Sequence, residues 1–331
     1  MNPSCYLHTY DTSIKKGFSL QTPKKKGVIL ENKDHQVVSE ASPLPGYSQE
    51  SFDTVYQELL LHLRTLETLS SLDMVHDFLL EIRLSPSSSF AIYSLFQQIF
   101  SPSIYPLVVP IRHYVDTSEE KLLSAMKNFP PDQLIKIKMG SYPVQRAIAL
   151  MKELSFYSQL HVDIGKKWSL EETLRFSDAF SAGRFVALED PVGTLQDLWL
   201  FAERSPHPIS LDHLLRLSSV EELLDVPNLV ACEYKPTLDM HLLLDKKLLT
   251  KLRQRNIAYT FSSSYETDVG IACIARLGFH LQATLPFGID TLSIFTKRLV
   301  QDPFAKDGDK LILSKKPQLI QNYAKSALPY C

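Results

Sequence analysis

Two lysines stand two residues apart in the apolar run LIKIKMG at residues 134–140. Side chains alternate between the two faces of a strand, so Lys136 and Lys138 would point to the same side. Like charges repel, and burying an ammonium group without a partner costs about 3 kcal/mol or more. The pair is therefore either the solvated face of a surface strand or part of a site that uses positive charge in chemistry.

Further polar residues follow Lys138 at a regular interval, each near the end of an apolar run. Counted from Lys138, the successive steps to Asp163, Glu189, Asp212 and Lys235 are 25, 26, 23 and 23 residues, and Ser262 comes 27 residues later. Charges scattered over a surface would not repeat in this way. The spacing predicts that these side chains converge on one volume.

Three of these residues are carboxylates on successive segments, namely Asp163, Glu189 and Asp212. As bare anions in one pocket they would repel one another strongly. An all-oxygen ligand set suits a hard divalent cation, so we expect Mg²⁺, with Mn²⁺ as a substitute. Zinc fits less well because no cysteine lies at these positions.

Lysines flank the carboxylates on both sides. Lys138 and Lys235 would face each other around a closed barrel, with the metal-bound substrate between them. A divalent cation can stabilise the enediolate that forms when the carbon next to a carboxylate loses its proton. Positive charge from Lys136, Lys235 and the metal favours the neutral form of Lys138, which we expect to be the base.

Repeated strand–helix units must position these residues. From about residue 105, β-branched apolar runs such as LVVPIRHYV, QLHVDIG and HLQATLPFG alternate with amphipathic segments. Several of those segments open with a capping signature, in the pairs Ser169/Glu172, Thr194/Asp197 and Ser218/Glu221. Eight such units close most naturally into a barrel, and an open doubly wound sheet is the alternative.

The composition narrows the class of protein. The chain has 331 residues and a net charge of −2, which argues against a general nucleic-acid binder. No apolar run approaches the ~20 residues of a membrane helix, and the N-terminus lacks the features of a secretory signal. The four scattered cysteines favour a reducing cytoplasm. Gly-rich nucleotide loops, GxSxG elbows and HExxH helices are absent from the sequence.

The ordered motifs resemble those of the enolase superfamily, in its muconate-lactonizing-like branch. The matching segments are K-I-K at Lys136–Lys138, D-I-G-K-K-W at Asp163–Trp168, L-E-D-P at Leu188–Pro191, D-H-L-L-R at Asp212–Arg216 and K-P-T at Lys235–Thr237. Three more segments resemble the o-succinylbenzoate synthase family in particular. They are S-P-L-P-G-Y-S-Q-E-S at Ser42–Ser51, S-S-S-Y-E at Ser262–Glu266 and L-P-F-G-I-D-T at Leu285–Thr291.

The resemblance implies an α/β fold, a modified (β/α)8-type TIM barrel of (β/α)7β form with an N-terminal α+β capping domain. The capping domain would span residues 1–104, the barrel 105–299, and a segment at 300–331 would return to the cap. In the cap, VILENKDHQVVSEASP is typical of two strands joined by a polar turn, and Glu50 to Leu69 of an amphipathic helix. Loops around residues 18–26 and 43–47 would close over the barrel mouth.

The implied reaction is the Mg²⁺-dependent dehydration of 2-succinyl-6-hydroxy-2,4-cyclohexadiene-1-carboxylate to o-succinylbenzoate, in menaquinone biosynthesis. Lys138 would remove the proton, Asp163, Glu189 and Asp212 would hold the metal that stabilises the enediolate, and Lys235 would offer positive charge to the ring. Candidate substrate contacts are His161, Ser262, Ser263, Ser264 and Gly288. His161 could equally be a satisfied core histidine, and the serines could equally cap the next helix.

Three positions depart from the family pattern. Gly165 replaces the usual asparagine, His213 replaces a glutamate, and His161 replaces an arginine found in many of the synthases. Losses around metal ligands can cost about 10–100-fold in affinity or activity.

Other readings of the same site stay open. Two lysines suit an N-succinyl amino acid racemase or epimerase, a cycloisomerase is also compatible, and a barrel that has lost catalysis could serve as a binding module. We expect a small-molecule carboxylate as the partner, no nucleic acid or membrane, and a monomer or weak homo-oligomer.

Overall fold

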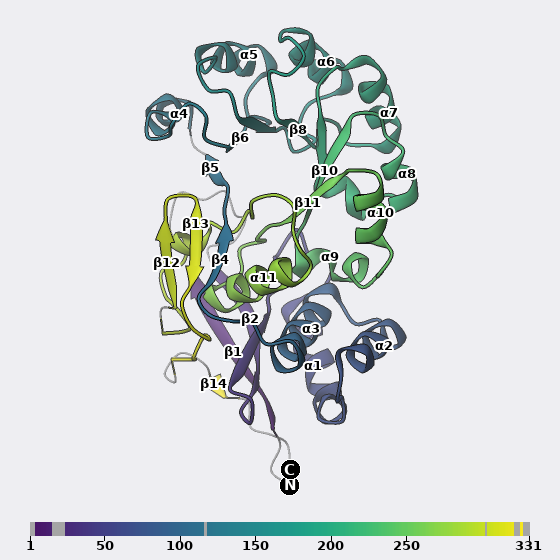
Figure 1. Ribbon diagram of the computed structural model, residues 1–331, viewed down its shortest axis with the longest axis vertical. Helices are drawn as coiled ribbons and strands as arrows, with labels where there is room; N and C mark the ends of the chain where they lie inside the picture. The colour runs from purple at the N-terminus through teal and green to yellow at the C-terminus, as the bar shows by residue number, and fades with distance from the viewer. Residues whose placement is uncertain (1–3, 15–23, 116–117, 302, 321–324, 327–331) are drawn as a thin grey trace. The chain divides into compact units, whose positions relative to one another are not determined.

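The computed structural model describes residues 4–14, 24–115, 118–301, 303–320 and 325–326. The chain forms two compact units, which are described separately (Figure 1). The first unit is built from Met1–Ile111, Tyr234–Lys246 and Phe261–Cys331, and the second from Arg112–Glu233 and Lys247–Thr260. The boundaries at residues 104 and 299 stay a prediction, and of the two predicted cap loops, residues 18–23 lie outside the described residues.

A seven-stranded sheet carries most of the repeated units, in the strand order β11-β10-β9-β8-β7-β6-β5. Its strands are β5 (His113–Val115), β6 (Ile135–Lys138), β7 (Leu160–Asp163), β8 (Ala187–Glu189), β9 (Ile209–Leu211), β10 (Leu229–Tyr234) and β11 (Ala258–Phe261). Neighbouring strands from β5 to β10 pair in parallel, so their carboxyl ends lie along one edge of the sheet.

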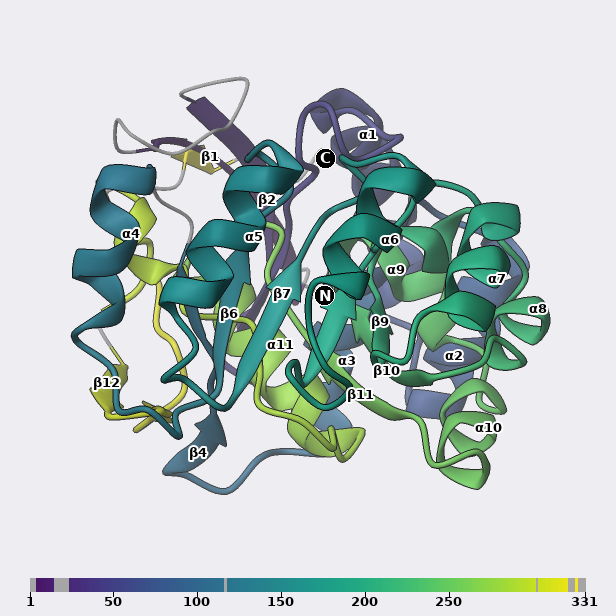
Figure 2. The same ribbon diagram turned by 90° about the horizontal axis from the view of Figure 1, so that it is seen from above.

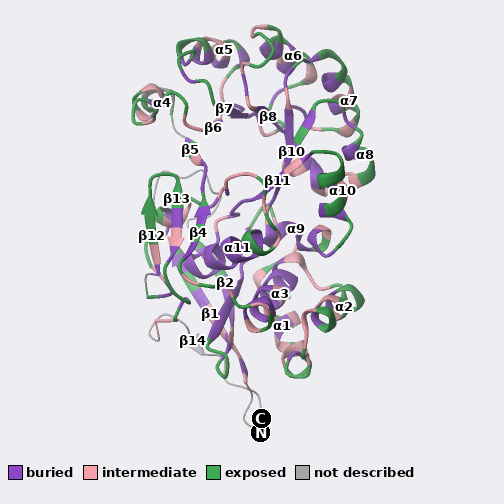
Figure 3. Cartoon of the chain, in the orientation of Figure 1, coloured by how far each residue is buried: buried purple, intermediate pink, exposed green. Residues whose placement is uncertain are grey.

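Helices follow the strands along the chain. They are α4 (Glu119–Met126), α5 (Val144–Glu153), α6 (Leu170–Asp178), α7 (Leu195–Arg204), α8 (Val220–Leu224), α9 (Pro236–Leu243), α10 (Leu248–Gln254) and α11 (Asp268–His280). Figure 2 shows α5, α6 and α7 next to one another over the sheet, and consecutive members of the three are in contact. The strands between them are buried and the outer sides of the helices are exposed (Figure 3).

Two of the three predicted helix caps are confirmed and one is wrong by a residue. Ser169 and Glu172 form a reciprocal capping box at α6, and Thr194 caps α7 through the amide of Asp197. At α8 the cap is Ser219, which accepts from the amide of Glu222, instead of the predicted Ser218 and Glu221. Two consecutive serines each stand three residues before a glutamate, so the sequence pattern suits both registers.

The eighth strand of the predicted barrel is reduced to two isolated parallel bridges in the first unit. Phe287 pairs with Ile111, and Gly288 pairs with Ser262, the residue that follows β11. The segment LPFG therefore takes the place of a last strand with a minimum of pairing.

The remaining strands of the first unit form two antiparallel sheets. One has the order β14-β1-β2-β3, from β1 (Cys5–Ser13), β2 (Lys24–Asn32), β3 (Val37–Ala41) and β14 (Lys325–Ser326). Three helices follow it in the chain, α1 (Phe52–Leu66), α2 (Leu72–Ile82) and α3 (Pro86–Phe100). These elements confirm the predicted strand pair and the predicted amphipathic helix.

The run LVVPIRHYV, predicted as one strand, is divided between two sheets. Its first half is β4 (Leu107–Pro110), which pairs with β13 (Lys310–Leu313), itself paired with β12 (Phe304–Asp307). Its second half is β5, which pairs with β6. Pro110 has no amide hydrogen and ends the first piece, which explains a break that periodicity alone does not reveal.

The observed order of strands and helices, with the separate antiparallel sheet at the N-terminus, is that of a modified TIM barrel with an N-terminal capping domain. Short 3₁₀ turns at His213–Arg216 and Leu292–Ile294 complete the described elements. None of the helices in the described part of the chain is long and apolar enough to cross a membrane.

Candidate functional site

Strand register brings the first predicted site residues into one row of the second unit. Lys138 pairs with Asp163, and Asp163 pairs with Glu189 on the next strand. All three end their strands, where the loops of a parallel sheet converge. Asp163 and Glu189 are buried, and Lys138 is half-buried.

Carboxylates crowd the end of this row. One oxygen each from Glu189, Asp190 and Asp212 lie within 4.8 Å of one another. Burial, with Glu189 as the next cause, raises the pKa of Asp163 to about 6. Burial, with Asp212 as the next cause, raises the pKa of Asp190 to about 7. Buried carboxyl groups that resist ionisation because they lie beside one another are the donor set that a divalent cation satisfies, so the site fits such an ion.

Asp190 is a site residue that the sequence prediction missed. The predicted metal ligands were Asp163, Glu189 and Asp212, whereas the closest group of three contains Asp190 in place of Asp163. The carboxylate of Asp190 accepts the backbone amides of Asp212 at 3.1 Å and His213 at 2.8 Å. It therefore fixes the start of the loop after β9, and its place directly after Glu189 in L-E-D-P was the available signal.

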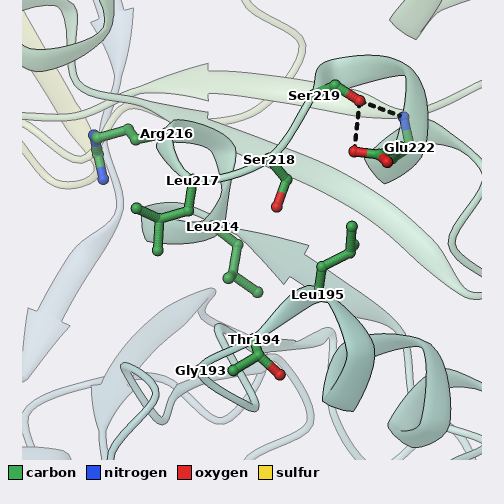
Figure 4. A pocket seen from close by; sticks show the side chains of 9 residues that line it. All are labelled: Gly193, Thr194, Leu195, Leu214, Arg216, Leu217, Ser218, Ser219 and Glu222. Atoms are coloured by element: carbon green, nitrogen blue, oxygen red, sulfur yellow. Dashed lines mark hydrogen bonds between the residues drawn. The ribbon is translucent and has the colours of Figure 1, made fainter.

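Asp212 is held from the other side by an arginine. Arg216 donates to Asp212 at 2.7 Å and also lines an open pocket of about 630 Å³ (Figure 4). That pocket lies between the loop that begins α7 and the loop between β9 and α8, where Ser219 contacts Glu222. Arg216 connects the lining of this pocket to the carboxylate cluster.

Lys136 is buried, which answers the question posed by the lysine pair. Its ammonium group lies 2.6 Å from Glu189, 3.3 Å from Glu233 and 3.5 Å from Asp163. Burial lowers the pKa of Lys136, but the surrounding carboxylates outweigh that effect and hold it well above its ordinary value. Lys136 is therefore a fixed positive charge beside the carboxylates, and the surface-strand reading is wrong.

A buried ion pair beneath this row was also missed. Arg112, just before β5, donates to Glu233 of β10 at 2.5 Å, and both side chains are nearly inaccessible to solvent. Glu233 in turn faces Lys136. Both residues interrupt apolar runs, LVVPIRHYV and LVACEYKP, which was the signal in the sequence.

His161 lies inside this network. Its Nε2 atom is 2.9 Å from both Ser210 Oγ and Glu189 Oε2, and its Nδ1 atom is 3.4 Å from Arg112. Burial lowers the pKa of His161, so the imidazole is the neutral form at neutral pH. The histidine thus contacts a predicted metal ligand directly.

The other two departures from the family pattern have defined surroundings. Gly165 adopts φ +58°, and a Cβ there would lie 3.3 Å from Asp163 Oδ1. His213 contacts Lys166 through its Nε2 atom, and burial lowers the pKa of Lys166. A lysine and a histidine therefore stand beside the carboxylate cluster where the family usually has a glutamate.

The remaining predicted site residues belong to the first unit. Lys235 is half-buried and directly precedes α9, and its backbone amide donates to Asp239 at 2.5 Å. Ser262 pairs with Gly288, and the amide of Ser263 donates to the Gly288 carbonyl at 3.0 Å. The prediction that Lys235 faces Lys138 stays a prediction.

The three serines differ in what they can offer a ligand. The hydroxyls of Ser263 and Ser264 both donate to Glu266, at 2.7 and 2.5 Å. The hydroxyl of Ser262 is buried and has no hydrogen-bond partner among the described residues. Of the three serine hydroxyls, only that of Ser262 is left without a partner among the described residues, a distinction that the sequence did not make.

No family model matches the chain. Among curated proteins, the chain is 24% identical to the o-succinylbenzoate synthase of Enterobacter sp. (strain 638), over 83% of this chain and 84% of that protein. Proteins of the same name from Vibrio cholerae and Yersinia enterocolitica are similarly related.

Solved structures share the fold. The L-Ala-D/L-Glu epimerase from Bacillus subtilis matches with a TM-score of 0.75 and 18% identity, covering 98% of this chain and 99% of that one. A member of the enolase superfamily from Listeria innocua matches with a TM-score of 0.74 and 16% identity, covering 97% and 96%. These comparisons confirm the predicted resemblance: the chain is an enzyme with the enolase-superfamily fold, and over more than four fifths of its length it is similar to o-succinylbenzoate synthases.

Proposed function

We propose that this enzyme dehydrates 2-succinyl-6-hydroxy-2,4-cyclohexadiene-1-carboxylate to o-succinylbenzoate, in menaquinone biosynthesis. The observation that carries the proposal is the row Lys138–Asp163–Glu189, in strand register at the carboxyl end of a parallel sheet with Asp212 beside it. The curated relatives that carry the synthase name support the choice of substrate.

Asp163, Glu189 and Asp212 would hold Mg²⁺, for which Mn²⁺ could substitute, with Asp190 next to them. When bound, the cation would supply Lewis-acid stabilisation for negative charge that develops on the substrate carboxylate. Asp190 and Arg216 would keep Asp212 in place through the hydrogen bonds described above.

Lys138 would take the proton from the ring carbon that bears the carboxylate. The bond between the neighbouring ring carbon and its hydroxyl group then breaks, and its electron pair leaves with hydroxide while the ring becomes aromatic. The abstracted proton and the hydroxide together make water, so the atoms balance. Lys136, a fixed positive charge two residues before Lys138 on β6, would support it as the base.

Lys235 would offer positive charge to the ring face, a contribution of about 0.5–2 kcal/mol that depends on desolvation. Ser262 and the backbone at Gly288 would contact the substrate, and His161, which lies against Glu189, would shape the site around it. Residues 1–104 would act as the capping domain, 105–299 as the barrel and 300–331 as a segment that returns to the cap. The expected setting is the cytoplasm, with a small carboxylate as the partner and a monomer or weak homo-oligomer as the assembly.

An ultraviolet assay tests the proposal. Purified protein with Mg²⁺ is given the cyclohexadiene carboxylate, and loss of the diene absorbance is followed as the aromatic product appears. We expect rapid loss that EDTA suppresses and that added Mg²⁺ restores. No turnover by folded, metal-loaded protein would contradict the proposed reaction.

A second candidate is an epimerase of N-succinyl amino acids, for which Lys138 and Lys235 would serve as alternate bases. It is favoured by the pair of lysines at the ends of β6 and β10. Polarimetry with an N-succinyl amino acid separates it from the synthase, because only an epimerase would remove the optical rotation.

A further inference from the structure

In the first unit, the buried carboxylate of Glu266 is surrounded by hydrogen-bond donors. This side chain is inaccessible to solvent and accepts four hydrogen bonds. Its donors are the hydroxyls of Ser263 at 2.7 Å and Ser264 at 2.5 Å, the backbone amide of Ser264 at 2.8 Å, and the hydroxyl of Thr237.

The donors come from two segments of chain that carry proposed substrate contacts. Thr237 lies in the first turn of α9, two residues after Lys235. Ser263 and Ser264 directly follow Ser262, whose hydroxyl has no partner among the described residues. The hydroxyls of Thr237 and Ser264 also lie 2.5 Å apart, so the two segments meet at the carboxylate.

A buried lysine holds the serine segment from another side. The ammonium group of Lys25, on β2, donates to the carbonyls of Ser264 at 3.0 Å and Tyr265 at 2.5 Å. Lys25 is 1% exposed. The carboxylate of Glu266 therefore binds the hydroxyls of Ser263 and Ser264, and Lys25 binds the carbonyls of Ser264 and Tyr265, which restrains this part of the segment from both sides.

We propose that Glu266 is a positioning residue, which holds the Lys235 segment and the Ser262 segment in a fixed relation to each other. The proposal rests on the proposed function, in which Lys235 and Ser262 contact the substrate. Misplacing a catalytic group by about 1 Å can cost about 100-fold in rate. By occupying Ser263 and Ser264, Glu266 also leaves Ser262 as the serine whose hydroxyl is available.

The same unit offers a matched control. Glu40 is also a fully buried carboxylate, and it accepts from Tyr10, from the amide and hydroxyl of Thr267, and from the amide of Gly270. None of these donors lies in the Lys235 or Ser262 segments. Tyr10, on β1, donates to Glu40, so removing its hydroxyl reports the stability cost of such a bond at the neighbouring buried carboxylate.

The test compares Thr237→Val with Tyr10→Phe, each of which removes one hydroxyl that donates to a buried carboxylate. We expect Thr237→Val to lower kcat about 10-fold or more while KM changes less than about 3-fold. Thr237→Ser, which keeps the hydroxyl, restores kcat. Tyr10→Phe lowers the midpoint of thermal unfolding but keeps the kcat of the wild type. Equal kcat values for Thr237→Val and Tyr10→Phe would overturn the proposal.

Hydrogen exchange separates this proposal from the proposed function. The peptide that contains Ser262–Tyr265 is followed by mass spectrometry in the same variants, without any substrate. Faster exchange of this peptide in Thr237→Val than in Tyr10→Phe supports the coupling through Glu266 even if the wild type does not turn over the cyclohexadiene carboxylate. Unchanged exchange in Thr237→Val overturns it, whatever the activity of the wild type.

Discussion

At the scale of single residues, the role of each charged side chain in the site depends on whether an opposite charge lies beside it. The buried Lys136 forms ion pairs with three carboxylates. Lys138, two residues later, ends the same strand and is half-buried. Lys136 lies against the carboxylates, as strand alternation places it. The two lysines therefore have different roles, because only one of them is tied down by ion pairs to Glu189 and Glu233.

Replacing Lys138 by alanine tests the proposed base. We expect Lys138→Ala to reduce turnover about 10²–10⁴-fold, because general-base catalysis is lost, while the free energy of unfolding changes little. Steady-state rates and a urea denaturation curve measure the two quantities. Lys152→Ala, at an exposed lysine of α5, is the control and should keep full activity. Near-normal turnover by Lys138→Ala would refute the assigned role.

Glu233 tests the buried ion pairs. Glu233→Gln leaves Arg112 and Lys136 with less negative charge in a buried site, so we expect the free energy of unfolding to fall by about 3 kcal/mol. Glu171→Gln, which breaks the exposed pair with Arg175, should cost about 0.5 kcal/mol or less. Denaturant unfolding of both variants compares them, and equal losses would show that the buried network has no special weight.

At the scale of elements, the register of β6, β7 and β8 does the positioning, and the turns that follow them are tightly packed. The chain leaves β6 at Met139 and Gly140, whose amides both point to the carbonyl of Asp163. A Cβ on Gly140 would lie 1.8 Å from the carbonyl oxygen of Ile164. The close approach of these two strand ends therefore requires glycine at this position.

Gly140→Ala should accordingly destabilise the fold. Because backbone would have to move to admit the methyl group, we expect a loss of about 3 kcal/mol in the free energy of unfolding. At Gly193 the nearest atom to an added Cβ is 3.8 Å away, so Gly193→Ala should change the free energy of unfolding by less than about 1 kcal/mol. Thermal unfolding of the two variants distinguishes them, and a Gly140→Ala protein as stable as the wild type would contradict the packing described.

The sequence predicted the strand ends better than it predicted their partners. Lys138, Asp163, Glu189 and Asp212 could be found because parallel units repeat at a constant length. Which carboxylate stands closest to Asp212, and which serine hydroxyl is left without a partner, depends on side chains that fold in from elsewhere. The division of LVVPIRHYV likewise depends on its partners β13 and β6, since both halves are equally suited to be strands.

At the scale of the whole molecule, the first unit is assembled from three separate stretches of chain. Buried polar contacts join the first stretch to the third and also hold the third stretch together. Glu40 of the first stretch receives donors from Thr267 and Gly270 of the third. Within the third stretch, Asp268 accepts the amides of Leu299 and Val300. Stability of this unit therefore depends on carboxylates in the interior, and so on pH.

Asp268 gives that dependence a direction. Burial raises the pKa of Asp268 to about 6, so the folded chain holds this proton more tightly than the unfolded chain does. Its contribution to the free energy of unfolding should fall as pH rises from about 4 to about 6, by up to about 3 kcal/mol, and stay constant above that. Asp268→Asn should remove this part of the slope, as denaturation midpoints at pH 4, 5, 6 and 7 would show. Identical pH profiles for the wild type and Asp268→Asn would contradict this contribution of Asp268.

The pairing of β1 with β14 has a consequence for the order of folding. Thr9 pairs with Lys325, which the ribosome adds 316 residues later. One edge of β1 must therefore stay without this partner until residue 325 has been synthesised, although β2 can pair with its other edge early. Contacts so distant in sequence form slowly, and an open strand edge invites association with other chains in the meantime. A nascent chain of this protein is therefore exposed to association with other chains until β14 has been synthesised.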